Sequence, residues 1–303
     1  MSHDALAPIG VIAHYNLLEA LDASGLGELF RARDTRHGRT VALRLLPADF
    51  TANSRELVER IRSAQRLSHP NAITVFDVGQ HDGRVYVVFE FLKGQSLRLE
   101  MAGRTVNLKR ALDMAIQIAD AVADAHAAGF VIRGLSPDAV VITARGHAKI
   151  AAYDLAVQNG LVYADGQARL PDYDAPEEAR GEPPDERSDV YSVGAILYEM
   201  LTMRRPMHRG ASAPSSTNAR VSKELDAVVL KAVAPNPDSR YQSVAAFAAA
   251  LRSVAAALSL DDSEGTRRGE QDAIAAMSRR GVVRTTAIIL AVLAAIVWWA
   301  TRS

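Results

Sequence analysis

The chain has 303 residues, enough for one large domain or two ordinary ones, and 49% of them are hydrophobic, enough for a sizeable core. Its 35 Lys and Arg residues balance 35 Asp and Glu residues, which excludes the global basic field that indicates a nucleic-acid partner. Cysteine is absent, so disulfides and thiol chemistry are excluded and a reducing compartment is favoured.

The first part of the chain is predicted to be rich in β-strands. Residues 1–14 are predicted as a tail without the basic-then-apolar pattern of a secretory signal, so we expect this end to stay in the cytosol. Apolar runs with β-propensity follow at 41–46 and 84–89. Between them, residues 55–67 predict a helix that ends before a Ser-His-Pro turn. Residues 15–91 are therefore predicted as a small β-rich lobe.

The pattern becomes helical from residue 107 onward. Apolar residues recur with the helical period, which places them on one face of each predicted segment. Four helices are predicted, at 108–127, 190–200, 222–233 and 243–256. Residues 92–252 are therefore predicted as a larger helical lobe, and the fold class is α+β with two lobes.

The C-terminal part is predicted to be a linker and a membrane anchor. Residues 253–284 are polar, and from residue 266 they carry five arginines against two acidic residues, a net charge of +3 that suits an anionic membrane surface. Residues 285–301 then run for 17 positions without a charge, the lower limit for crossing the hydrocarbon core. The alternative is a buried helix that closes a globular domain.

Two features of the charge-free segment support a transmembrane helix. The tandem Trp298-Trp299 lies where an interfacial aromatic belt would be, and more arginines precede the segment than follow it, which predicts that the N-terminal body is cytoplasmic. Within the segment, Ala287, Ala291 and Ala295 recur every four residues and form a small-residue face of the kind that permits homodimers in lipid. The alternative is that alanine is simply abundant in this chain.

Seven motifs, in order and at matching spacings, carry a family resemblance. They are Phe30–Asp34, Leu67–Asn71, Phe89–Leu92 followed by Gly94, Phe130–Ile142, Ala175–Glu177, Asp189–Gly194 and Asn236–Tyr241. Through them, residues 15–252 resemble bacterial membrane-anchored Ser/Thr protein kinases. The resemblance implies a two-lobed kinase fold and an ion pair between Glu177 and Arg240.

The segment that resembles the catalytic loop has lost its polar residues. Active kinases of this family carry His, Asp, Lys and Asn at positions that fall here on Ile132, Gly134, Ser136 and Ala139. In phosphoryl transfer the Asp orients the substrate hydroxyl and the Asn holds a metal ion. Gly134 therefore removes the base and Ala139 removes a metal ligand, while Arg133 and the apolar flanks remain.

The positions that would hold the phosphates and the main metal ion are also changed. Asp22 and Ser24 stand where the glycine loop would have glycines, and Arg44 replaces the strand lysine, which is not a conservative change. The position of the partner glutamate falls on Arg60, whose charge would repel that of Arg44, and the principal metal carboxylate falls on Ala152. Residues 152–177 contain no Ser or Thr, so they cannot form an ordinary Ser/Thr autophosphorylation switch.

These losses favour a catalytically inactive protein-kinase-like domain, a pseudokinase, that acts as a membrane-tethered scaffold or regulatory module at the cytoplasmic face of a bacterial membrane. Its expected partners are proteins and the membrane, not nucleic acid. No metal is expected, and ATP binding is expected to be weak or absent. The residues left for an adenine pocket are Ala42, Glu90, Leu92 and Val141.

Two other interpretations stay open at this point. One is a residual or atypical Ser/Thr protein kinase in which Asp138 or Asp154 takes over the base or metal role from a shifted position. It conflicts with the need for several such groups at once. The other is a decaying paralogue without a function, which the uninterrupted fold pattern opposes only mildly.

Overall fold

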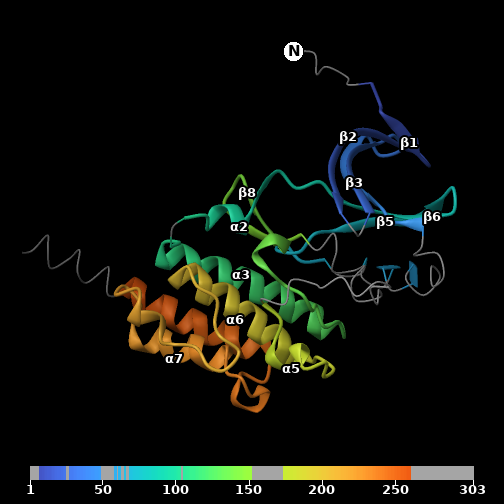
Figure 1. Ribbon diagram of the computed structural model, residues 1–303. Helices are drawn as coiled ribbons and strands as arrows, with labels where there is room; N and C mark the ends of the chain where they lie inside the picture. Colours follow the sequence, from blue (N-terminus) through green and yellow to red (C-terminus); the bar gives the residue numbers. More distant parts are fainter. Residues whose placement is uncertain are drawn as a thin grey trace, which may run out of the picture. The chain divides into compact units, whose positions relative to one another are not determined.

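The computed structural model describes residues 7–24, 27–48, 58–59, 61–62, 65, 68–103, 105–151 and 173–260. The chain divides into two compact units, Met1–Arg252 and Ser253–Ser303. The first unit contains the strands and helices that carry the candidate site (Figure 1). Arg60, Ala152 and Asp154, which the sequence singled out, lie outside the described residues.

An antiparallel sheet of six strands forms the N-terminal part of the first unit, in the order β1-β2-β3-β4-β6-β5. The strands are β1 (Gly10–Ile12), β2 (Tyr15–Ser24), β3 (Gly27–Asp34), β4 (Arg39–Leu45), β5 (Val75–His81) and β6 (Arg84–Glu90). The two apolar runs predicted as strands, 41–46 and 84–89, form β4 and β6. These strands are neighbours inside the sheet, where Ala42 pairs with Phe89.

The sheet buries both of its faces, which explains why β4 and β6 are apolar almost throughout. Successive side chains of a strand point to opposite faces. Val41 and Leu43 accordingly belong to one hydrophobic cluster and Ala42 to another. The cluster around Ala42 also contains Ile61, from the segment predicted as a helix, and Ala151. This second cluster therefore joins the sheet to the segment that leads to the candidate site.

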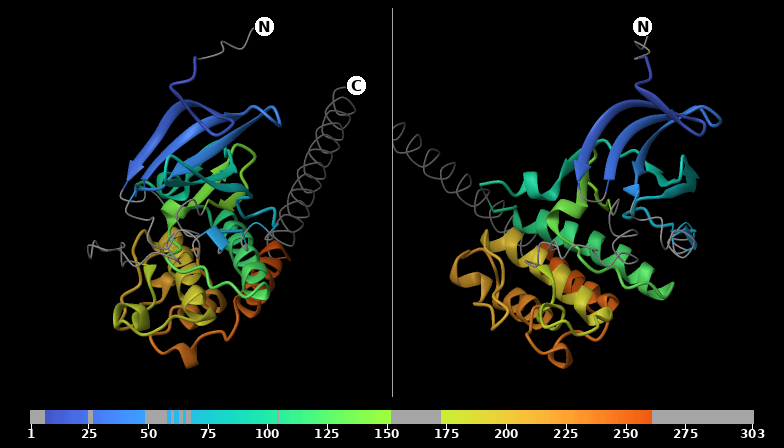
Figure 2. Two further views of the ribbon diagram at one scale, coloured as in Figure 1. Left: turned by 90° about the vertical axis from the view of Figure 1, so that its right-hand side faces the viewer. Right: turned by 45° about the vertical axis from the view of Figure 1, so that its right-hand side comes forward.

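The rest of the first unit is mainly helical, as predicted. The helices are α2 (Leu97–Glu100), α3 (Leu108–Ala127), α5 (Pro176–Ala179), α6 (Glu186–Thr202) and α7 (Lys223–Ala232), with short 3-10 turns at η2 (Pro137–Ala139), η4 (Pro214–Ser216) and η5 (Pro237–Ser239). A small sheet has the order β7-β8-β9, with β7 at Gly94–Ser96, β8 at Val140–Thr143 and β9 at Ala148–Ile150. Helix α6 packs against both α3 and α7 (Figure 2).

Side-chain caps fix where the main helices begin. The side chain of Asn107 accepts hydrogen bonds from the backbone N–H groups of the first turn of α3, and Ser222 does the same for α7. Asp185 and Ser188 cap α6 reciprocally, so this helix begins four residues before the predicted 190–200. The observed bounds of α3 match the predicted 108–127, because its cap and its apolar face coincide.

The described residues extend a short way into the predicted linker. Residues 244–260 are helical, so the helix predicted at 243–256 continues to residue 260 and includes the start of the segment predicted as a polar linker. No helix within the described ranges is long and apolar enough to cross a membrane. The predicted transmembrane segment, 285–301, lies beyond the part that the structure describes.

Candidate functional site

The loop that resembles a catalytic loop is held by a buried carboxylate. Asp189, in α6, accepts hydrogen bonds from the backbone N–H groups of Ile132 at 2.7 Å and Arg133 at 2.9 Å. His126 Nε2, at the end of α3, lies 2.7 Å from the same carboxylate. Asp189 is fully buried, so its charge requires these partners. They fix the backbone of the loop relative to α3 and α6.

Two consecutive residues of this loop adopt left-handed backbone conformations. The φ angles are 58° at Arg133 and 63° at Gly134. A left-handed conformation is strained for most residues with a side chain and is free of that strain for glycine. Gly134 therefore suits the local geometry, and at this position, where a base would be expected, the chain offers no functional group.

The candidate metal positions offer few ligands in the described part of the chain. Ser136 precedes η2 without a side-chain capping bond, and the N–H of Ala139 donates to the carbonyl of Ser136 at 3.0 Å. The carbonyl of Ala139 accepts from the N–H of Ala151 at 2.8 Å. Ala139 thus connects η2 through its backbone to the residue that follows β9, and its methyl group cannot bind a metal. Among the described residues, no group of three or more His, Cys, Asp or Glu residues could hold a metal ion.

Asp138, the residue suggested for a shifted base, is engaged by an arginine. The guanidinium of Arg98, in α2, donates to Asp138 Oδ2 at 3.2 and 3.3 Å. The same guanidinium donates to Glu199 Oε1 at 3.0 Å and to the hydroxyl of Tyr173 at 2.8 Å. Asp138 is therefore part of a network that ties α2, η2 and α6 together, and its Oδ2 is engaged by Arg98.

Arg44, which replaces the strand lysine, is buried against the backbone. Its Nη1 donates to the carbonyl of Gly27 at 3.3 Å. Gly27 has a φ of 96°, and a Cβ added there would lie 2.1 Å from the carbonyl oxygen of Leu45. The glycine retained at this end of the loop is thus required by its close approach to β4, whether or not phosphates bind.

The described part of the 55–67 segment contains one carboxylate, which forms an ion pair within the segment. Glu59 pairs with Arg62 at 2.9 Å, and the Glu59 side chain is 71% exposed. Ile61 is fully buried in the sheet cluster. The predicted repulsion between Arg44 and Arg60 stays a prediction.

Three of the four residues predicted for an adenine pocket lie in one hydrophobic cluster. Ala42, Leu92 and Val141 pack there with Phe89 and other apolar side chains. The side chain of the fourth predicted residue, Glu90, instead binds Lys149, whose Nζ donates to the two carboxylate oxygens at 2.7 and 2.9 Å. Sequence reasoning missed Lys149, although its place between two buried residues of β9 indicates an outward-facing side chain.

The ion pair expected between Glu177 and Arg240 is confirmed. Both nitrogens of the Arg240 fork contact the carboxylate of Glu177 at 2.7 Å, and both residues are buried. Ser188 donates a further hydrogen bond to Glu177 at 2.8 Å. Burial alone would raise the pKa of Glu177, but the hydrogen bonds from Arg240 and Ser188 outweigh it and lower this pKa.

Comparison with known proteins relates most of the chain to one family. The family model described as the protein kinase domain matches residues 15–257. The probable serine/threonine-protein kinase SCO3848 of Streptomyces coelicolor is 36% identical over 256 residues, covering 76% of this chain and 38% of that protein. The serine/threonine-protein kinase PknB of Mycolicibacterium smegmatis is 33% identical over 263 residues, covering 78% of this chain and 42% of that protein.

Solved structures agree with this relationship. The kinase domain of Mycobacterium tuberculosis PknI, crystallised as a C20A mutant, superposes with a TM-score of 0.67 at 26% identity, covering 82% of this chain and 98% of that chain. The curated relatives are longer proteins, since the chain spans about two fifths of the length of those it matches. The similarity therefore concerns the domain rather than the whole of these proteins.

Proposed function

The chain belongs to the protein kinase domain family, and we propose that within this family it is a pseudokinase, which binds or regulates a protein partner instead of transferring phosphate. One observation carries the proposal. The backbone of the catalytic loop is fixed by Asp189, while Gly134 and Ala139 place no functional group at the base and metal positions. The scaffold of the site is thus kept without its reactive groups.

The residues present do not fit a magnesium-bound nucleotide. Magnesium requires hard oxygen ligands, which Ala139 and Ala152 cannot supply. Base catalysis contributes about 10² to 10⁴ in rate, and metal ions neutralise the charge that develops on the phosphates. The apolar wall formed by Ala42, Leu92 and Val141 supports at most weak binding of an adenine ring, independent of metal.

The nucleotide prediction tests this function directly. We expect ATP to produce the same small thermal shift, or none, with Mg²⁺, with Mn²⁺ and with a chelator. A ligand present at 100 times its Kd adds about 2.7 kcal/mol to the free energy of unfolding. A metal-dependent stabilisation of that size would restore the kinase interpretation.

A matched variant separates binding in the cleft from binding elsewhere. Ala42 is fully buried beside Phe89 in the apolar wall, so Ala42→Leu should fill the space that an adenine would need. Any weak metal-independent shift should disappear in this variant. A shift that survives it belongs to another surface and gives no support to an adenine pocket.

We further propose that residues 285–301 anchor the domain in a bacterial membrane, with the domain on the cytoplasmic side, where its partners would be proteins or a second copy of the chain. The charge-free segment after a basic linker supports this placement. The full chain should sediment with membranes and resist carbonate extraction, whereas residues 1–260 should stay in the supernatant. Release of the full chain by carbonate would contradict the anchor.

A further inference from the structure

Two cavities adjoin each other at the hairpin between β8 and β9, and neither is lined by a residue of the loop 130–139. Their volumes are ≈ 610 and ≈ 630 Å³, and both are lined by Thr143, Ala144 and Arg145. Two backbone hydrogen bonds close the hairpin, from Thr143 to His147 at 2.9 Å and from Gly146 to Thr143 at 2.8 Å. The wall shared by the cavities is therefore a defined turn.

The larger cavity, which we call the hairpin cavity, has a basic lining. Lys93, Arg145, His147 and Lys149 contribute to it, and none of the carboxylates that the structure describes does. Lys149 is compensated by Glu90, whereas Lys93 and Arg145 form no ion pair with any residue that the structure describes. Because the charges of the whole chain balance, two exposed and uncompensated cations at one cavity are a local excess.

The neutral polar groups of the hairpin cavity already bond to each other. The Asn71 amide donates to Gln117 Oε1 at 2.9 Å and to the carbonyl of Ala148 at 2.8 Å. Gln117 in turn accepts from the N–H of Ala148 at 2.9 Å and donates to Asp113 at 2.8 Å. These bonds hold the polar side of the cavity in place. The donors left for a ligand are those of Lys93, Arg145 and His147, which together match an anion with several oxygens.

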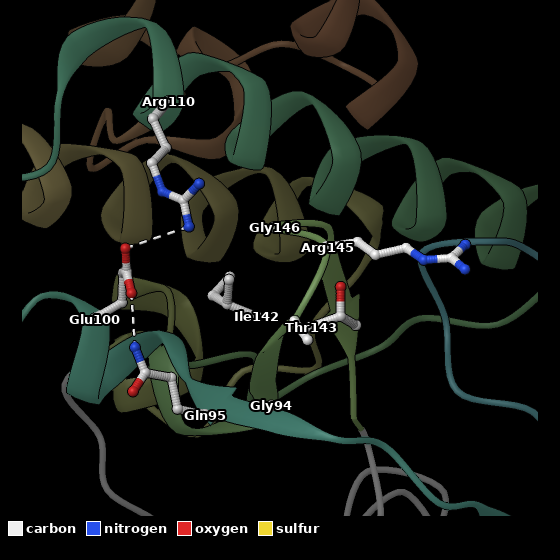
Figure 3. A pocket seen from close by; sticks show the side chains of 9 residues that line it. Gly94, Gln95, Glu100, Arg110, Ile142, Thr143, Arg145 and Gly146 are labelled. Carbon is white, nitrogen blue, oxygen red and sulfur yellow. Dashed lines mark hydrogen bonds and ion pairs between the residues drawn. The ribbon is translucent and has the colours of Figure 1, made fainter.

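The adjoining cavity offers a different environment (Figure 3). Glu100 bridges two of its residues, with Arg110 Nη2 at 3.3 Å and Gln95 Nε2 at 2.7 Å. The Nε of Arg110 is buried and has no hydrogen-bond partner among the described residues. Backbone and apolar groups of Gly94 and Ile142 complete the wall. This cavity is therefore better suited to uncharged residues that flank an anionic group in a ligand than to a second anionic group.

We propose that the hairpin cavity binds a phosphorylated Ser or Thr residue of a protein partner, in an extended segment whose neighbouring residues occupy the adjoining cavity. A phosphate monoester carries close to two negative charges and strong acceptor oxygens, which complement Lys93 and Arg145. Among the described residues, no Phe, Tyr or Trp side chain lines either cavity for stacking bases, which disfavours a nucleic acid. The proposal names the chemistry of a partner for the proposed scaffold, and it stands even if the cleft proves catalytic.

The full chain, purified in detergent, should be tested against a degenerate peptide library centred on phosphothreonine and the same library with threonine. We expect selective retention of phosphorylated members. For a selected peptide followed by fluorescence anisotropy, the double variant Lys93→Gln and Arg145→Gln should weaken binding about a hundredfold, about tenfold for each charge-assisted hydrogen bond lost. Arg145→Glu should abolish it. The control Arg209→Gln, an exposed arginine of the 203–213 loop outside both cavities, should bind like the unchanged protein.

The remaining outcomes overturn the proposal. Equal retention of both libraries would show that the phosphate is not recognised. Equal binding by the double variant, with an unchanged melting temperature, would show that the peptide does not bind at this surface. Displacement of the peptide by inorganic phosphate at the same concentration would assign the cavity to a free anion. Displacement by glycerophosphoglycerol at that concentration would assign it to a lipid headgroup.

Discussion

Replacing Arg240 by methionine should lower the free energy of unfolding by about 3–5 kcal/mol, because it leaves the buried carboxylate of Glu177 without its partner. Arg240 also donates to the backbone carbonyls of Ala234 at 2.7 Å and Arg187 at 3.0 Å, which would lose these bonds as well. Urea denaturation of residues 1–260 followed by circular dichroism measures the loss. Fluorescence of the two tryptophans would not, since both lie in the predicted transmembrane segment.

A double-mutant cycle separates the ion pair from these backbone bonds. Glu177→Leu combined with Arg240→Met should cost less than the sum of the two single changes, because the double variant buries no lone charge. Arg252→Met breaks an exposed pair with Asp120 and should cost less than about 1 kcal/mol. If the losses in the free energy of unfolding from the two single changes simply add up in the double variant, Glu177 and Arg240 are not coupled.

The ion pair also predicts a pH dependence. The pKa of Glu177 is lowered in the folded state, so this residue stabilises the fold above its unfolded pKa and ceases to do so as the pH falls through the lowered value. The difference in the free energy of unfolding between Glu177→Gln and the unchanged protein should therefore disappear in acid. An equal difference at neutral and acidic pH would contradict the lowered pKa.

The parts of the fold that could be predicted from the sequence are those with strong periodicity or a clear end. Helix α3 has both an apolar face and the Asn107 cap, and its bounds were predicted correctly. The start of α6 was placed too late, because its first turn is polar and only the cap at Asp185 marks it. The strands β7 and β9 have three residues each, too few for an alternating pattern to be recognised.

For the candidate site, the missing functional groups could be predicted from the sequence more readily than the side-chain contacts. Gly134 and Ala139 could be interpreted by position alone, because a missing functional group needs no partner to be recognised. Contacts between distant segments could not. Arg98 lies 40 residues before Asp138 and 101 before Glu199, and only the packing of α2 on η2 and α6 brings the three together. The structure therefore shows that Arg98 pairs with Asp138, one of the two carboxylates that the alternative kinase interpretation offered.

Restoring a carboxylate by Gly134→Asp should leave phosphoryl transfer undetectable. A general base alone contributes about 10² to 10⁴ in rate, and catalytic groups that act as a unit are strongly non-additive. The metal ligands would still be missing at Ala139 and Ala152, so the phosphates would not be neutralised. Transfer of radiolabelled phosphate to the chain itself and to a generic protein substrate measures the result, with M. smegmatis PknB assayed in parallel as the active reference.

Gly134→Asn is the matched control for this change. Asn and Asp are similar in size and both tolerate the left-handed conformation that the φ of 63° imposes, so the two variants should melt at similar temperatures. Asn supplies no base. Measurable transfer by the Asp variant but not the Asn variant would mean that residues at other positions bind the metal in place of the ligands missing at Ala139 and Ala152. The pseudokinase proposal would then fail. Silence of both variants, in a protein whose loop is still held by Asp189, is the result expected of a scaffold.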